Sequence, residues 1–202
     1  MISIMAFAFF VVTKTTTADY MDEESKTINT VQLLLDSTVI VKVNGGGGGG
    51  FYISDNEIIT NFHVINDAKS VFIKKSNGQM CFADVVFTQS ETDLSLIKTD
   101  CEGKPILLAE SVKVGQSVLA MGNPLGQEFF VSKGIVGLIN SNGVLHDAIT
   151  DQGMSGGPVV GLDGRLVGVI QGSAKELPKM SMAIDIKTLS YFMYQAKGMG
   201  DD

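Results

Sequence analysis

Short runs of apolar residues, separated by turn-forming residues, cover most of this chain and predict β-strands. The turns are marked by pairs such as Asn77-Gly78, Asn142-Gly143 and Asp163-Gly164, which suit the backbone of tight turns. Asp163-Gly164 lies between two apolar pairs and is a strong hairpin signal. The predicted strands are 38–43, 51–54, 57–61, 70–75, 79–87, 94–99, 117–121, 129–139, 158–161, 165–171 and 180–184.

Two segments repeat their apolar residues at helical spacing instead. The first is a short amphipathic helix over 26–36, and the second is a closing helix over 186–197. Their apolar positions are Ile28, Val31, Leu34 and Leu35 in the first, and Ile186, Leu189, Phe192 and Met193 in the second. About a dozen strands followed by one terminal helix predict an all-β fold, in which two β-barrels pack together and a helix docks at the end.

Six consecutive glycines, Gly45 to Gly50, interrupt the first pair of strands. Such a tract predicts a flexible loop, because glycine has the largest conformational freedom of any residue. A phosphate-binding role is rejected, since the tract lacks the Lys and Ser/Thr of a P-loop and a strand follows it rather than a helix.

The amino-acid composition indicates a folded domain and argues against several classes of binding partner. Hydrophobic residues make up 45% of the chain and charged residues 18%, which supports a buried core. The net charge is −7 with no basic cluster, so nucleic acid is not an expected partner. The histidines and cysteines fit no metal-binding pattern. We therefore expect neither a metal nor a cofactor.

The two cysteines, Cys81 and Cys101, allow two structural interpretations. They are either free thiols in apolar surroundings or a disulfide across a hairpin formed by the segments 79–87 and 94–99. The disulfide reading rests on their symmetric placement about position 91 (81 + 101 = 182). It would imply an oxidising compartment.

The N-terminus bears on the compartment as well. Ile2 to Val12 is an almost unbroken apolar run, too short to span a bilayer, and Thr16-x-Ala18 resembles a cleavage site. No Lys or Arg precedes the run. We expect residues 1–25 to form a signal-like leader with an acidic linker, and hence export to the periplasm or outside the cell. The alternative is an uncleaved element that packs on the domain or rests on a membrane without spanning it.

The most specific chemical signal is Gly153-Met154-Ser155-Gly156-Gly157-Pro158. A serine hydroxyl needs a neighbouring general base to act as a nucleophile. It also needs donors for the oxyanion that forms on attack, and the backbone N–H groups of Gly153, Met154 and Ser155 are the candidates. Glycine at 153 permits the backbone angles that aim such amides into one cavity.

A base and its orienting carboxylate precede that serine. His63 follows an apolar strand, and Asp93 opens an alternating one. Taken alone, the histidine is explained well as a core residue, and the aspartate as a turn-forming residue. Together with Ser155 they follow the order His, Asp, Ser, which predicts a catalytic triad. His146 is the only rival base, and we expect it in a loop at the rim of the site.

The segments TNFHVI, TDLSLIK, GNPLG, SKGIVGLI, GMSGGPVV and GRLVGV resemble successive landmarks of the Deg/Htr trypsin-like serine proteases. The resemblance runs from about Thr38 to the closing helix. It implies a protease domain over 26–202 with the chymotrypsin fold, two six-stranded antiparallel barrels over about 37–110 and 111–185 and a helix at 186–197. It is compatible with a trimer but leaves the oligomeric state open.

Three departures from the family pattern are visible. Met154 stands where the family usually has asparagine, which puts the oxyanion turn in question. The six-glycine tract replaces the usual serine-containing glycine motif. No PDZ module is expected, since such a module needs roughly 80–100 further residues.

The resemblance also places the primary pocket, which in this fold is walled by the segment before the nucleophile and the strand after it. The candidate substrate-binding residues are Ile149, Thr150, Ile170, Gln171 and Gly172. Ile149 stands where trypsins have an aspartate, so we expect cleavage after small or medium apolar residues. The expected function is a serine endopeptidase in protein processing or quality control. The alternative is a peptide-binding pseudo-protease with a collapsed oxyanion turn.

Overall fold

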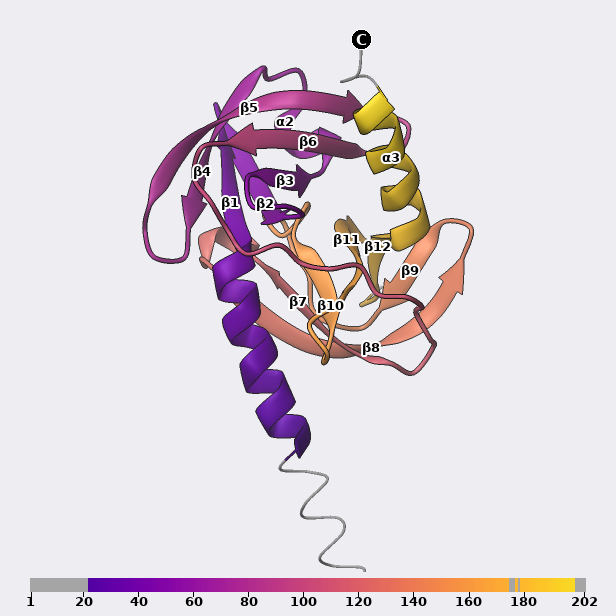
Figure 1. Cartoon of the computed structure of the whole chain (residues 1–202). Helices are drawn as coiled ribbons and strands as arrows, with labels where there is room; N and C mark the ends of the chain where they lie inside the picture. The colour runs from indigo at the N-terminus through magenta and orange to yellow at the C-terminus, as the bar shows by residue number, and fades with distance from the viewer. Residues whose placement is uncertain (1–21, 175–176, 178, 199–202) are drawn as a thin grey trace, which may run out of the picture.

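The computed structural model describes residues 22–174, 177 and 179–198 of the chain, and residues 1–21 of the predicted leader lie outside them. The described residues form two closed six-stranded antiparallel barrels, one above the other in Figure 1, with a helix at the C-terminal end. The all-β prediction of two barrels and a closing helix is therefore confirmed.

The first barrel closes around β-branched and aromatic residues. Alternate positions of its strands point inward, and Val39 and Val41 of β1 are examples that are fully buried. Lys42, the next residue of β1, is exposed. Its strands, in order around the barrel, are β1 (Thr38–Val43), β2 (Gly46–Tyr52), β3 (Glu57–Thr60), β6 (Leu94–Thr99), β5 (Met80–Gln89) and β4 (Ser70–Lys75).

The second barrel has the same closed topology and a core of small and branched side chains. Val136, Val144, Val159 and Ala183 lie inside it with almost no exposed surface. Its strands, in order around the barrel, are β10 (Pro158–Gly161), β11 (Leu166–Ser173), β12 (Ser181–Asp185), β9 (Gly143–His146), β8 (Phe130–Asn140) and β7 (Ser117–Gly122).

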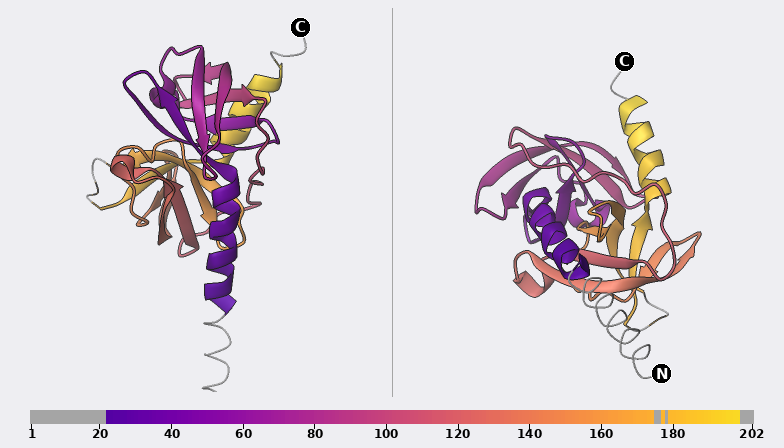
Figure 2. Two further views of the ribbon diagram at one scale, coloured as in Figure 1. Left: turned by 90° about the vertical axis from the view of Figure 1, so that its left-hand side faces the viewer. Right: turned by 60° about the horizontal axis from the view of Figure 1, so that its bottom comes forward.

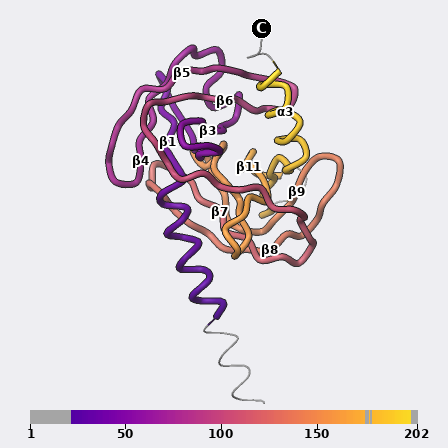
Figure 3. The backbone as a smooth tube through the Cα atoms, in the orientation of Figure 1, coloured from indigo at the N-terminus to yellow at the C-terminus, as the bar shows by residue number. Residues whose placement is uncertain are grey.

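A third core lies between the barrels, and both long helices contribute side chains to it. Figure 3 shows the paths of these helices beside the barrels. The C-terminal helix α3 (Ile186–Gly198) contributes Leu189 and Phe192, and the Phe192 ring packs 5.1 Å from that of Phe87. The N-terminal helix over 22–37 contributes Leu34. Burying these apolar faces fixes one barrel against the other.

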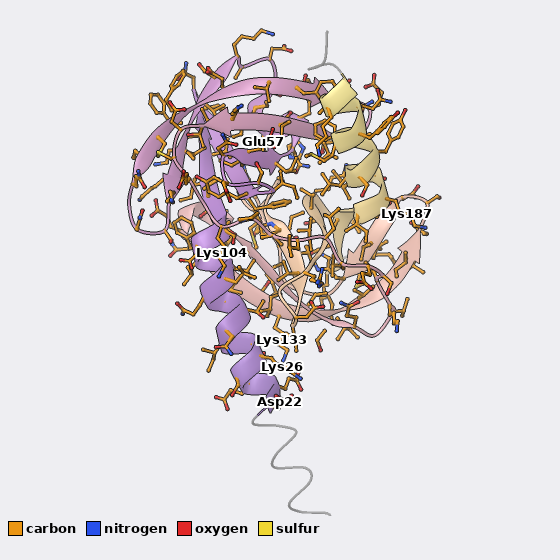
Figure 4. The ribbon with its side chains drawn as sticks, viewed as in Figure 1. Asp22, Lys26, Glu57, Lys104, Lys133 and Lys187 are labelled. Atoms are coloured by element: carbon orange, nitrogen blue, oxygen red, sulfur yellow. A yellow bond between two sulfur atoms is a disulfide. The ribbon has the colours of Figure 1, made fainter. Side chains whose placement is uncertain are left out.

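The N-terminal helix is longer than the predicted 26–36, because residues 22–25 of the expected acidic linker are helical. It runs away from the first barrel and along the second (Figures 1 and 2). The Thr30 hydroxyl donates to the Leu162 carbonyl at 3.0 Å, and the Lys133 ammonium, labelled in Figure 4, lies 2.7 Å from the Glu23 carboxylate. In the described part of the chain, no helix is long and apolar enough to cross a bilayer.

The prediction of a flexible loop at the six glycines was wrong. Gly46 to Gly50 form the first part of strand β2 and pair with β1 in continuous register, from Val43↔Gly46 to Thr38↔Phe51. Hydrogen bonds of the ladder and tight packing against the second barrel order this tract despite its intrinsic freedom.

Strand β9 (Gly143–His146) was also missed, because only Val144 and Leu145 are apolar between the Asn142-Gly143 turn pair and His146. His146 ends this strand and is fully buried in the second barrel, opposite Val136 of β8 and Ser181 of β12. The expectation of a rim loop for His146 was therefore wrong.

Cys81 and Cys101 are joined in a disulfide, with their Cα atoms 6.3 Å apart. The pairing continues the β5–β6 register, in which Ala83 faces Thr99. The Tyr52 hydroxyl donates to the Cys101 carbonyl at 2.7 Å, and burial raises the pKa of Tyr52 to about 12. The disulfide thus ties the end of β6 to both β5 and the first barrel's core.

Candidate active site

A short helix presents His63 at the mouth of the junction between the barrels. Strand β3 ends at Thr60, and α2 (Phe62–Ile65) follows directly. Val64 and Ile65 are buried in the first barrel's core and anchor the helix, while about half of the His63 side chain (47%) is exposed. The imidazole is therefore held by a rigid support and still open to a substrate.

Asp93 fixes both the backbone and the ring of His63. One carboxylate oxygen, Oδ1, accepts the His63 backbone N–H at 3.0 Å, and the other, Oδ2, lies 2.8 Å from the ring Nδ1. A proton on Nδ1 then satisfies the carboxylate and leaves Nε2 as the basic nitrogen. This is the arrangement that a general base needs.

The backbone of Asp93 is held as tightly as its side chain. Its φ of +54° lies in the left-handed region, which is uncommon for residues other than glycine. The Asp93 carbonyl accepts from the Phe62 amide at 3.1 Å and from the Asn61 side-chain amide at 2.9 Å. These two hydrogen bonds from the start of α2 stabilise the unusual backbone conformation and hold Asp93 beside His63.

The Ser155 turn contains two positions that only glycine can occupy. Gly153 and Gly156 have φ values of +98° and +85°. A Cβ at Gly153 would lie 2.4 Å from the Asn123 carbonyl oxygen, and one at Gly156 would lie 2.4 Å from the Gly49 carbonyl oxygen. The conformation of the turn is thus set by backbone packing on both sides of the nucleophile.

Two amides at this turn remain free. Within the described residues, the N–H groups of Gly153 and Ser155 donate no hydrogen bond, whereas the Met154 amide donates to the Asp151 carbonyl at 3.0 Å. Of the three amides expected to serve an oxyanion, only Gly153 and Ser155 are therefore unoccupied. Met154 does not disturb the turn, because its side chain is fully buried in the second barrel's core.

Gln171 of β11 contacts both ends of the site. Its side-chain amide donates to Asp93 Oδ2 at 3.4 Å, and its carbonyl accepts from the Ser155 hydroxyl at 3.2 Å. Among the described residues no hydrogen bond joins Ser155 to the His63 ring, so the hydroxyl points toward β11 in this state. Catalytic hydrogen bonds commonly tighten only when substrate binds.

A cleft of about 970 Å³ adjoins these groups. His63, Asp93, Gln171 and Gly172 line it on the catalytic side. The rest of the lining is largely apolar and comes from the β8–β9 hairpin, β12 and the segment after β11, including Leu138, Leu145, Leu177 and Met182.

The other three residues predicted to bind substrate, Ile149, Thr150 and Ile170, do not line this cleft. Ile149 is exposed (66%), and the Thr150 hydroxyl donates to that of Ser181 at 2.7 Å. Ile170 is buried in the second barrel's core, so it presents no side chain to a substrate. Its backbone carbonyl instead accepts the Gly156 amide at 2.8 Å and supports the nucleophile turn.

His146 cannot serve as the base. Burial lowers its pKa to about 4, against a smaller opposing effect of Asp147, and neither ring nitrogen has a hydrogen-bond partner within the described chain. No group of three or more metal-binding side chains lies together in the residues that the structure describes.

Sequence reasoning missed Asn61 and Gly49, which support Asp93 and the Ser155 turn. Asn61 lies two residues before His63, and an amide side chain at the end of a predicted strand was the available signal. For Gly49 no local signal exists, since all six glycines of the tract look alike.

The chain is similar in sequence and in fold to known proteins. Residues 48–169 match the family model described as "Trypsin-like peptidase domain". The chain is 34% identical over 126 residues to a "Probable periplasmic serine endoprotease DegP-like" of Halomonas elongata, covering 57% of this chain and 27% of that protein. It is 33% identical over 158 residues to "Serine protease HTRA1" of Xenopus laevis, covering 70% and 34%. The chain thus spans about a third or less of these relatives.

Two solved structures share the fold. A crystal structure of the serine endoprotease from Yersinia pestis superposes with a TM-score of 0.77 at 29% identity, covering 85% of this chain and 66% of the other. A structure of Rv3671c from M. tuberculosis H37Rv in an inactive form also gives 0.77, at 21% identity, covering 84% and 90%. The second likeness concerns the fold alone.

Proposed function

Because the chain belongs to the trypsin-like peptidase family, we propose that it is a serine endopeptidase whose nucleophile is Ser155. The observation that carries the proposal is the pairing of the Asp93 carboxylate with His63 Nδ1 at 2.8 Å beside a turn with two free amides. A structural histidine would need no such pair of unoccupied donors next to a serine.

The proposed reaction has two halves. His63 Nε2 accepts the Ser155 hydroxyl proton as the oxygen attacks the scissile carbonyl carbon, and the Gly153 and Ser155 amides donate to the resulting oxyanion. The C–N bond then breaks as His63 returns the proton to the leaving amine. Water attacks the acyl-enzyme by the same proton route and releases the acid and Ser155. Asp93 holds the ring and stabilises the imidazolium throughout.

We further propose that the enzyme cleaves after small or medium apolar residues. The cleft beside His63 is lined by Leu138, Leu145, Leu177 and Met182, and its acidic lining residue, Asp93, is already bonded to His63. An apolar lining favours apolar side chains, since burial removes their surface from water.

The biological role in this proposal is protein processing or quality control after export. Support comes from the signal-like sequence pattern at the N-terminus and from the Halomonas relative, which is described as a "Probable periplasmic serine endoprotease DegP-like". The predicted triad and this role are separate claims, and failure of the second would leave the first standing.

The test is digestion of a permanently unfolded protein by the wild type and by Ser155→Ala, with the fragments identified by mass. We expect cleavage by the wild type only, mainly after apolar residues. Equal fragmentation by Ser155→Ala would contradict the role of Ser155. Cleavage confined to Arg or Lys sites would contradict the proposed specificity alone.

A further inference from the structure

A second cavity, of about 410 Å³, reaches the nucleophile turn and shares no lining residue with the catalytic cleft. Gly153, whose amide is a proposed oxyanion donor, lines it. Gly48 lines it as well, and a Cβ at Gly48 would lie 2.6 Å from the Ser155 carbonyl oxygen. The cavity therefore begins directly beside the nucleophile.

The position of the second cavity suits the part of the substrate that follows the cut bond, which leaves first in the proposed reaction. A peptide whose scissile carbonyl faces the Gly153 and Ser155 amides must continue in both directions from that point. In the proposed function the acyl side occupies the larger cleft, which Gln171 and Gly172 line. The second cavity is then the path left for the residues after the cut bond.

One wall of this cavity carries side chains on its β1 side only, because its β2 residues are all glycines. The wall is formed by the β1–β2 hairpin, where Lys42 faces Gly47 and Val43 faces Gly46 in the strand register. The remaining wall comes from the segment Asn123–Gly126, which includes the short 3₁₀ helix η1 (Pro124–Gly126), and from Gln152. The glycines leave the Lys42 side chain without a neighbour on β2.

Lys42 is the only charged residue among those that line the second cavity. Its side chain is exposed and makes no hydrogen bond or ion pair with any described residue. Its strand neighbours offer no carboxylate, since Phe72 faces it from β4. The nearby Lys74 ammonium is already paired with Glu128 at 2.6 Å. In a chain of net charge −7, this end of the site thus has an unneutralised positive charge.

From these observations we propose that Lys42 selects an acidic side chain, Asp or Glu, among the first residues that follow the cut bond of the substrate. The inference rests on the proposed endopeptidase function and adds the substrate class of its leaving-group side. An exposed ion pair of this kind strengthens binding by about two- to fivefold.

The test uses quenched fluorescent peptides that share one acyl side and place Glu, Gln or Lys at each of the first three positions after the cut bond. At one of these positions we expect the wild type to cleave the Glu peptide about two- to fivefold faster than the Gln peptide, by kcat/KM. For Lys42→Ala that ratio should fall to about one, and for Lys42→Glu the Lys peptide should become preferred.

Lys187→Ala is the matched control, because it removes the same charge from α3, where Figure 4 shows Lys187 on the flank of the molecule. It should keep the wild-type Glu/Gln ratio. Equal cleavage of all three peptides by the wild type, or an unchanged ratio in Lys42→Ala, overturns the Lys42 assignment while the protease function stands. Absence of any Ser155-dependent cleavage overturns both.

Discussion

The Gly49 amide donates a hydrogen bond to the Ser155 carbonyl oxygen at 2.8 Å, so the first barrel holds the nucleophile turn of the second. The Gly49 carbonyl, in turn, accepts the Thr60 hydroxyl at 2.7 Å, just before α2 and His63. A single residue of the glycine strand thereby connects the segment before His63 with the Ser155 turn, which lie on different barrels.

Gly49→Ala is expected to disturb this junction. The added Cβ would lie 2.8 Å from the Gly157 nitrogen, a backbone atom that cannot move without shifting the Ser155 turn. We expect a loss of about 1–3 kcal/mol in unfolding free energy, together with a lower kcat. Gly46→Ala is the control for stability, since a Cβ there meets nothing within 4 Å and should change the unfolding free energy by less than about 0.5 kcal/mol. Equal denaturation midpoints for the two variants would contradict this account.

Asp93→Asn should remove activity while keeping the fold. Asparagine tolerates the left-handed backbone that Asp93 adopts, and its carbonyl oxygen can still accept the His63 backbone N–H. Its NH₂ group would then face Nδ1 and impose the wrong ring tautomer, for a fall in kcat of about 10⁴-fold. Glu91→Gln removes the same charge from the same loop and should retain wild-type kcat. A fall of less than tenfold in Asp93→Asn would argue against the proposed role of Asp93.

Acid should destabilise the protein through His146. Its pKa is about 4 in the folded chain, below the ordinary value of 6.5, so the unfolded chain binds more protons between these values. The stabilising contribution is complete above about pH 6.5 and is lost as the pH falls toward 4, by about 2 kcal/mol at pH 5. His146→Leu should therefore lose about 2 kcal/mol less than the wild type between pH 7 and pH 5 in urea titrations. Parallel stability curves for the two proteins would refute the assignment.

Reduction should destabilise the first barrel. The Cys81–Cys101 disulfide closes a loop of 20 residues in sequence separation, and its loss is expected to lower the unfolding free energy by about 3 kcal/mol. A Cys81→Ser/Cys101→Ser double variant should show this loss without reductant and should not respond to it. If reductant leaves the wild-type unfolding midpoint unchanged, the bond does not form in the protein.

The barrels, and the close pairing of His63 with Asp93, could be predicted because their signals are local. Alternating runs and turn pairs mark the strands, and His63, Asp93 and Ser155 each stand in a distinctive segment. Their order along the chain then ties the three together.

Features that depend on contacts distant in sequence could not be predicted. Gly49 meets Ser155 across more than 100 positions, and nothing in a uniform glycine run distinguishes it from Gly46, whose surroundings are open. His146 looked like a loop residue because polarity alone suggested exposure, whereas its strand pairs it with Val136 and Ser181 inside a barrel. The unpaired charge of the Lys42 side chain gains significance only from the cavity that it lines, which the sequence does not reveal.

The most direct measurement is labelling with a fluorophosphonate, which reacts only with a serine activated by a neighbouring base. The wild type should gain one adduct per chain, mapped by mass to the peptide that contains Ser155, and His63→Ala should gain none at the same time and concentration. No adduct on a folded wild-type protein, or an adduct that forms equally fast in His63→Ala, would contradict the central claim that His63 activates Ser155.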